Sequence, residues 1–146
     1  MKIKYTAVFR NNGAPLLDSR GRIVKRPIVQ IELSGKDGST IEAPALVDSG
    51  ADTTTLNIQY ADYLGITLDQ NAQKEIMGIG KGRVPTFPGV ISFKIKGFDE
   101  SIEVPVWFVD SENVNILLGQ EVFFETYRIK FEKDHDIFEI IKSNRT

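Results

Sequence analysis

The chain has 146 residues and contains no cysteine. This absence excludes disulfide bonds, thiolate metal sites and a cysteine nucleophile. There is a single histidine, His135, and it lies in the polar segment 132–136, which is typical of a surface turn. A histidine metal site or a Ser-His pair would need this side chain beside other functional groups, so neither is expected.

No stretch of the sequence approaches the roughly 18 apolar residues that a membrane-spanning helix needs. Residues 1–5 also lack the apolar region of a signal peptide, so a cytoplasmic location is expected. The formal net charge of −2 gives no general attraction to nucleic acid or to a membrane surface. Two basic clusters, at residues 20–26 and 94–96, lack interleaved aromatic residues and are expected to be solvated.

Apolar residues make up 41% of the chain and charged residues 26%, which is typical of a globular protein. We expect one domain over residues 1–146, because this length suits a single hydrophobic core. Strand patterns dominate, and they cover residues 2–10, 28–33, 40–47, 83–96, 102–109, 127–131 and 137–141. Their regular turn spacing predicts a mostly β fold that closes into a barrel-like structure.

One or two short helices are expected beside these strands. The first covers residues 58–64, with Asn57 as its N-cap and Gly65 as its C-cap. The second covers residues 120–126. Within the strand at residues 40–47, Pro44 predicts an edge position or a break in the hydrogen-bond ladder.

The most informative motif is Asp48-Ser49-Gly50, which follows an apolar run directly. An apolar strand seldom ends in a carboxylate without a use for it. One interpretation is a catalytic carboxylate that activates water as a general base. The other is an aspartate that starts a turn, where Ser-Gly allows the backbone to bend.

Amide hydrolysis without a metal needs one group to take a proton from water and another to polarise the carbonyl. Two carboxylates that share one proton supply both roles, because like charges about 3 Å apart cannot both ionise. The chain has a single Asp-Ser/Thr-Gly, at Asp48. The partner carboxylate would therefore come from a second copy, which predicts a two-fold symmetric homodimer.

Three further features accompany this motif. Asp52 would accept hydrogen bonds from a substrate backbone, pair with a basic residue at the interface, or cap local amides. The glycine-rich segment 78–82 favours a hairpin lid that contacts substrate through Ile79, with an ordinary surface hairpin as the alternative. The apolar run 116–119 predicts a core strand, and its Leu117 would line a pocket beneath Asp48.

Together these motifs resemble the retropepsin-like aspartic proteases, with the core at about residues 26–141. The resemblance is carried, in this order along the chain, by Arg26-Pro27-Ile28-Val29 and by segments 45–53, 76–80 and 114–119. The helix at residues 57–64 resembles cellular members more than a minimal viral one. The family implies a homodimeric endopeptidase that cleaves peptides through a noncovalent tetrahedral intermediate, with no cofactor.

The resemblance also implies residue roles. Asp48 would be the catalytic aspartate, Ser49 would join the two active-site loops, and the Gly50 carbonyl would meet substrate. Ala51 and Asp52 would line the cleft. The flap tip and the floor of the cleft would be formed by Gly78, Ile79, Gly80, Leu117, Leu118 and Gly119.

The chain departs from the viral pattern after Gly119, where Gln120-Glu121 replaces an arginine that usually pairs with the aspartate at the Asp52 position. The interface must therefore be built differently. Two other functions stay open at this point. One is a non-catalytic peptide-binding or assembly module with the same fold. The other is a divalent-cation site that uses Asp48 and Asp52.

Overall fold

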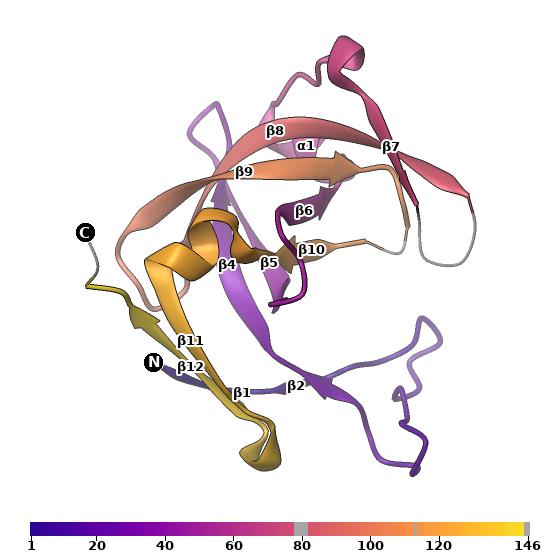
Figure 1. Cartoon of the computed structure of the whole chain (residues 1–146), viewed down its shortest axis with the longest axis vertical. Helices are drawn as coiled ribbons and strands as arrows, with labels where there is room; N and C mark the ends of the chain where they lie inside the picture. The colour runs from indigo at the N-terminus through magenta and orange to yellow at the C-terminus, as the bar shows by residue number, and fades with distance from the viewer. Residues whose placement is uncertain (78–81, 113, 145–146) are drawn as a thin grey trace.

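A computed structural model describes residues 1–77, 82–112 and 114–144 of the chain. Six strands form a closed ring in the order β4, β5, β10, β6, β9 and β8, because β4 also pairs with β8 (Figure 1). Their bounds are β4 Ile28–Ser34, β5 Thr40–Val47, β6 Thr54–Asn57, β8 Arg83–Ile95, β9 Ser101–Val109 and β10 Ile116–Leu118. The predicted closed β-barrel is confirmed.

The barrel is filled by one side of each strand, as the period of two requires. In β8, Ile91, Phe93 and Ile95 are buried, whereas the side chains between them are only half-buried. The same alternation places Ala45 and Val47 of β5 in the core. The interior of the barrel is therefore apolar, and any polar chemistry must lie at the ends or on the outer face of its strands.

Pro44 lies where β5 has a neighbour on one side. β4 pairs with β5 along its whole length, and Gln30 is opposite Pro44. β10, on the other side, pairs only with Leu46 and Val47. Pro44 therefore occupies the edge position that the sequence predicted. A proline is tolerated there because it has no N–H to donate to a neighbouring strand.

A second sheet of three strands lies beside the barrel in the order β1 Lys2–Lys4, β12 Ile137–Lys142 and β11 Tyr127–Glu132. The predicted final strand pair is thus confirmed. Its turn contains η3 Lys133–His135, which carries the exposed His135. Tyr127 joins the sheet to the barrel through an edge-to-face contact with Phe98, at a ring centroid distance of 5.3 Å.

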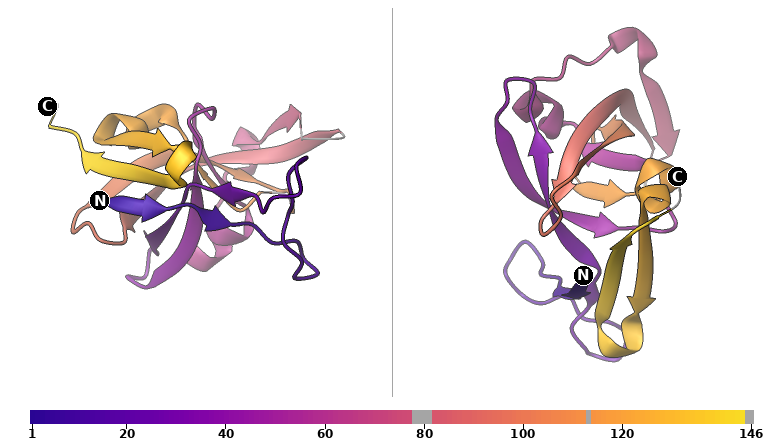
Figure 2. Two further views of the ribbon diagram at one scale, coloured as in Figure 1. Left: turned by 90° about the horizontal axis from the view of Figure 1, so that it is seen from below. Right: turned by 90° about the vertical axis from the view of Figure 1, so that its left-hand side faces the viewer.

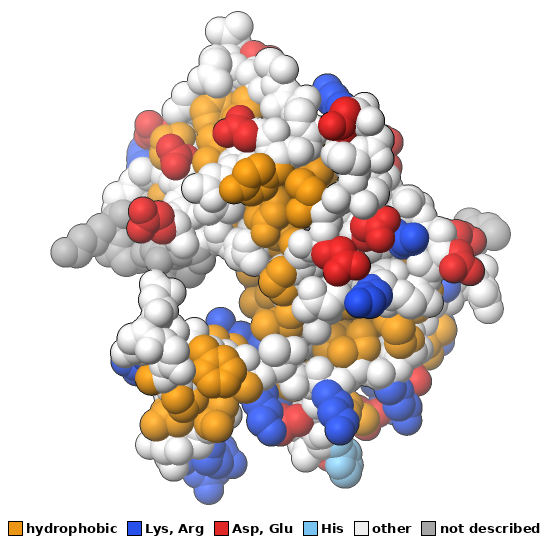
Figure 3. Space-filling view, turned by 180° about the vertical axis from the view of Figure 1, so that it is seen from behind, with side chains coloured by type: hydrophobic (Ala, Val, Ile, Leu, Met, Phe, Trp, Pro, Cys, Tyr) orange, Lys and Arg blue, Asp and Glu red, His pale blue; other side chains and the backbone are white. Residues whose placement is uncertain are grey.

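Residues 8–24 form an arm that extends from the same end of the barrel as the β11–β12 hairpin (Figure 2, right). β2 Thr6–Ala7 pairs with β3 Lys25–Arg26 at the base of the arm. The strand predicted to reach residue 10 ends earlier, because the chain changes partner from β12 to β3. Phe9 is 60% exposed, contrary to the half-buried position that its alternation indicated. The arm stands apart from the barrel in the space-filling view (Figure 3).

The predicted first helix is α1 Gln59–Leu64, followed by Gly65 in the left-handed conformation (φ 69°). The N-cap residue is Ile58 and not Asn57, although the Asn57 side chain still accepts a hydrogen bond from the Gln59 amide. Two shorter elements, η1 Gln70–Ala72 and β7 Lys74–Met77, lead to the hairpin with β8.

The helix predicted over residues 120–126 is only partly correct. In η2 Gln120–Phe124, Glu121 has extended backbone angles and Val122 has φ 66°, so a helical turn forms only after these residues. The physical reason is that the amides of Gln120 and Glu121 donate to the carbonyls of Ala51 and Asp52. Across the described ranges, no helix has the length and apolar character to cross a membrane. The cytoplasmic location stays a prediction.

Candidate active site

Asp48 lies at the end of β5, in the loop that leads to β6. β10 holds both stems of this loop, since it runs parallel to β5 and antiparallel to β6. The Asp48 amide continues this pairing by donating to the Leu118 carbonyl at 3.0 Å. The strand order therefore fixes where the Asp48 backbone lies before any side-chain interaction is considered.

The Asp48 carboxylate is half-buried and is oriented by its own loop. Its Oδ1 atom accepts a hydrogen bond from the Gly50 amide at 3.0 Å, and the Ala51 amide donates to the Asp48 carbonyl at 3.2 Å. A Cβ atom on Gly50 would lie 3.3 Å from the same Oδ1, closer than most such contacts. Glycine at position 50 therefore gives the carboxylate room to turn back over the loop.

Gly119 supports this loop from below at unusually close range. A Cβ atom here would lie 2.6 Å from the Thr53 carbonyl carbon and 2.8 Å from the Ala51 oxygen. The Gly119 amide donates to the buried Thr54 hydroxyl at 3.0 Å. Only glycine allows this approach, so the sequence Leu118-Gly119 has a steric role in addition to its place in the core.

Gln120 provides a contact that the sequence analysis did not find. Its Nε2 donates to the Ser49 carbonyl at 2.7 Å, and its amide donates to the Ala51 carbonyl at 2.8 Å. The residue that replaces the usual arginine thus ties the active-site loop to η2 by neutral hydrogen bonds. The only signal in the sequence was its position directly after Gly119.

The side chains of Ser49 and Asp52 are exposed at the rim of the site. Within the described segments, Asp52 forms no ion pair, and Glu121 lies nearby because its amide donates to the Asp52 carbonyl at 2.9 Å. No lysine or arginine occurs between Lys36 and Lys74. The loop itself therefore contributes acidic side chains and no basic ones to this end of the barrel.

Leu117 belongs to a row of side chains on the outer face of the barrel. It lies opposite Leu46 on one side and Thr55 on the other, and Thr55 lies opposite Trp107. All four are half-buried. Leu46 comes two residues before Asp48, so the row begins on the Asp48 side of β5. Leu117 was predicted from the sequence and the other three were not, although the period of two in β5 indicated Leu46.

The predicted flap lies only partly within the structure. β7 and β8 pair in the antiparallel hairpin that the sequence indicated, with Met77 opposite Arg83. Gly78, Ile79 and Gly80, the predicted flap tip, lie outside the described residues. Their contact with substrate stays a prediction.

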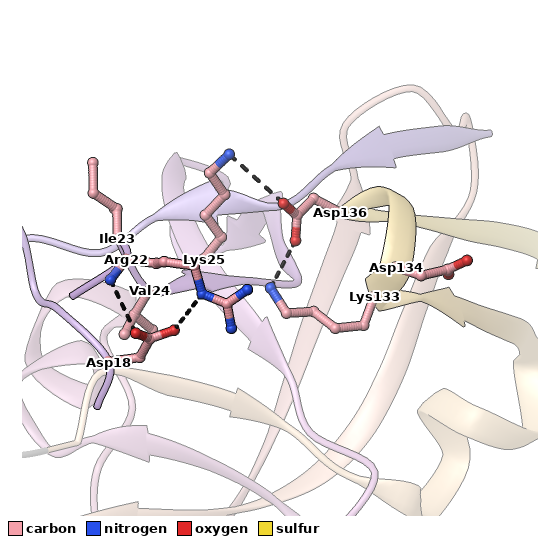
Figure 4. A pocket seen from close by; sticks show the side chains of 8 residues that line it. All are labelled: Asp18, Arg22, Ile23, Val24, Lys25, Lys133, Asp134 and Asp136. Atoms are coloured by element: carbon pink, nitrogen blue, oxygen red, sulfur yellow. Dashed lines mark hydrogen bonds and ion pairs between the residues drawn. The ribbon is translucent and has the colours of Figure 1, made fainter. Parts of the chain in front are cut away.

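A cavity of about 850 Å³ lies away from Asp48, between the arm and the β11–β12 turn (Figure 4). Arg22 pairs with Asp18 at 3.2 Å across its wall, and Lys133 and Lys25 pair with Asp136 at 2.6 and 3.7 Å. Asp134 also lines the cavity, so three acidic side chains balance three basic ones and the cavity offers no net charge to a ligand. Its size alone does not make it the functional site.

In the part of the chain that the structure describes, no group of three or more His, Cys, Asp or Glu side chains is placed to hold a metal ion. Asp48 and Asp52 thus have no third protein ligand of these types. The arrangement that the geometry does offer is a rigid loop with one oriented carboxylate, beside an apolar row.

Residues 29–122 match the model of a family described as aspartyl protease. The chain belongs to the aspartyl protease family. The resemblance to aspartic proteases inferred from the sequence is thereby confirmed. Among curated protein sequences, none matches the chain significantly.

The retropepsin-like fold inferred from the sequence is confirmed by a solved structure that aligns with nearly the whole chain. A retropepsin-like aspartic protease from Rickettsia conorii aligns with a TM-score of 0.55 at 15% identity, covering 97% of this chain and 98% of that one. EIAV protease in complex with the inhibitor HBY-793 aligns with a TM-score of 0.46 at 24% identity, covering 69% and 88%. The retroviral protease-like domain of Ddi1 from Leishmania major aligns with a TM-score of 0.49 at 16% identity, covering 77% and 87%.

Proposed function

We propose that this aspartyl protease family member is an endopeptidase, formed from one domain over residues 1–146, that acts as a homodimer with one Asp48 from each subunit. The observation that carries the proposal is the Asp48 loop. β10, Gly119 and Gln120 hold this loop so that one carboxylate stands at the end of the barrel. Such fixed geometry is what a catalytic group needs. The same loop in a second subunit supplies the carboxylate that the single chain lacks.

In the proposed reaction, the two Asp48 carboxylates share one proton. The ionised one takes a proton from water, and the protonated one donates a hydrogen bond to the substrate carbonyl. The water oxygen then attacks the carbonyl carbon and forms a noncovalent tetrahedral intermediate. Its collapse breaks the C–N bond as a protonated Asp48 carboxyl gives a proton to the amine leaving group, so that the two carboxylates again share one proton. Asp52 and the Gly50 carbonyl would hold the peptide backbone in the cleft.

The test compares wild type with Asp48→Asn on a library of unstructured peptides between about pH 4 and pH 7. Asp62→Asn is the matched control, because Asp62 is exposed on α1. We expect cleavage by wild type and by Asp62→Asn, and none by Asp48→Asn. A chelator should leave the rate unchanged. Equal cleavage by wild type and Asp48→Asn would contradict the proposal.

Subunit mixing tests the dimeric site directly. After exchange with an equal amount of Asp48→Asn, the activity of a fixed amount of wild type should fall to about half, because half of its subunits then lie in mixed dimers. Unchanged activity would show that one Asp48 suffices. A stable dimer that cleaves no peptide would instead favour the non-catalytic peptide-binding or assembly module.

A further inference from the structure

The row of side chains on the outer face of the barrel ends beneath a positive charge. The ammonium group of Lys74 lies over the ring of Trp107, 5.4 Å from its centroid. Trp107 is followed along the row by Thr55, Leu117 and Leu46, each directly opposite the next. One face of four neighbouring strands thus offers apolar surface that starts near Asp48 and ends at a cation.

The structure fixes Lys74 at the base of the β7–β8 hairpin. Lys74 lies opposite Thr86, and the Thr86 hydroxyl donates to the Lys74 carbonyl at 3.0 Å. Pro88, two residues after Thr86, lies opposite Trp107. The period of two therefore places the Lys74 side chain on the same face as Trp107. This placement does not depend on the tip of the hairpin.

The charge of Lys74 is available to a ligand. Within residues 1–77, 82–112 and 114–144, it forms no ion pair with a carboxylate, and Glu75, its neighbour in sequence, pairs with Arg83. The loop near Asp48 carries Asp52 and no basic residue. A negatively charged ligand group would be repelled at the loop and attracted at Lys74. The aromatic ring beneath the ammonium also offers an apolar surface against which the methylene groups of an acidic side chain can pack.

We propose that Lys74 and Trp107 form a subsite that binds an acidic side chain of the peptide substrate; this proposal rests on the proposed endopeptidase function. The row crosses from β5 to β9 in three strand spacings, which is about 14 Å, or the length of about four residues of extended peptide. The acidic residue therefore lies three or four residues from the bond that is cleaved. In a two-fold symmetric dimer the subsite occurs twice, so the preference extends to both sides of that bond.

The first test uses one peptide that wild type cleaves and replaces each position in turn by glutamate or by glutamine. At about pH 6, where glutamate is ionised, we expect glutamate to raise kcat/KM about three- to tenfold over glutamine at the third or fourth position. Lys74→Met should remove this preference. Lys74→Glu should reverse it, so that this variant prefers a peptide with lysine at the same position. Lys96→Met is the control, because Lys96 is exposed just beyond β8 and should keep it. Equal values for glutamate and glutamine at every position in wild type would overturn the subsite.

The second test needs no cleavage, because Trp107 is the only tryptophan in the chain. In Asp48→Asn, the glutamate peptide should change the tryptophan emission at a lower concentration than the glutamine peptide. The added substitution Lys74→Met should make the two concentrations equal. Selective binding in a protein whose wild type cleaves nothing would refute the endopeptidase and support the subsite. Cleavage by wild type with no selectivity between the glutamate and glutamine peptides, in rate or in binding, would support the endopeptidase and refute the subsite.

Discussion

Gly119→Ala tests whether the active-site loop is held by the close approach of β10. The new methyl group would lie 2.6 Å from the Thr53 carbonyl carbon, 2.7 Å from the Thr53 oxygen and 2.8 Å from the Ala51 oxygen. All three are backbone atoms, so no side chain can rotate to make room. The backbone angles of Gly119 (φ −102°, ψ −173°) suit any residue, so the effect is steric and not conformational.

The expected loss has two parts. Inserting a methyl group into a closely packed site costs about 1–3 kcal/mol. Moving β10 away also breaks the hydrogen bond from the Gly119 amide to the Thr54 hydroxyl, and an unpaired buried amide costs about 1–3 kcal/mol. The free energy of unfolding should therefore fall by about 2–6 kcal/mol, which lowers Tm by about 5–20 °C for a chain of this size.

Urea unfolding and peptide cleavage, both measured well below Tm, separate these effects from simple instability. Thr54→Val removes the hydrogen bond without the clash, so it should cost less than Gly119→Ala. Gly89→Ala is the matched steric control, since its Cβ would also lie 2.6 Å from a neighbour, the buried Phe108 ring. It should lose stability but keep kcat/KM, because it does not contact the loop. If Gly119→Ala unfolds within about 0.5 kcal/mol of wild type and keeps full activity, the loop is not held in this way.

Two further predictions concern stability. The Thr55 hydroxyl is buried and has no hydrogen-bond partner among the described residues. Thr55→Val should therefore leave the free energy of unfolding unchanged or raise it by up to about 1 kcal/mol. A clear loss of stability in urea unfolding would show that the hydroxyl is paired. The hydrogen bond from Lys133 lowers the pKa of the Asp136 carboxyl, with a smaller effect from Lys25. A lowered pKa means that the ionised carboxyl stabilises the fold at neutral pH and that this stabilisation is lost as the pH falls through the folded-state pKa. Asp136→Asn, which suits the left-handed backbone there (φ 51°), should therefore be less stable than wild type near pH 7, and this difference should shrink as the pH falls through the folded-state pKa. Asp134→Asn should match wild type throughout, and an equal loss in the two variants would contradict this assignment.

The sequence predicted the barrel well because its strands follow the period of two. Ile91, Phe93 and Ile95 alternate with polar residues, and each is buried. The turn at Asp48, Ser49 and Gly50 was also predictable, since these residues are adjacent in sequence and their geometry is local; the catalytic role of Asp48 stays a prediction. The Gly65 C-cap was predicted for the same reason: its left-handed conformation depends on its own residue type.

The features that the sequence did not show depend on contacts between distant segments. Gln120 reaches Ser49 across 71 residues, and no pattern within residues 118–126 indicates this hydrogen bond. The start of η2 stays extended because the backbone amides of Gln120 and Glu121 donate to the Ala51 and Asp52 carbonyls, although the composition of this segment favours a helix. Trp107 was counted only as part of an apolar strand, and its place beside Thr55 depends on a parallel pairing between β6 and β9. Local propensity cannot predict such pairings.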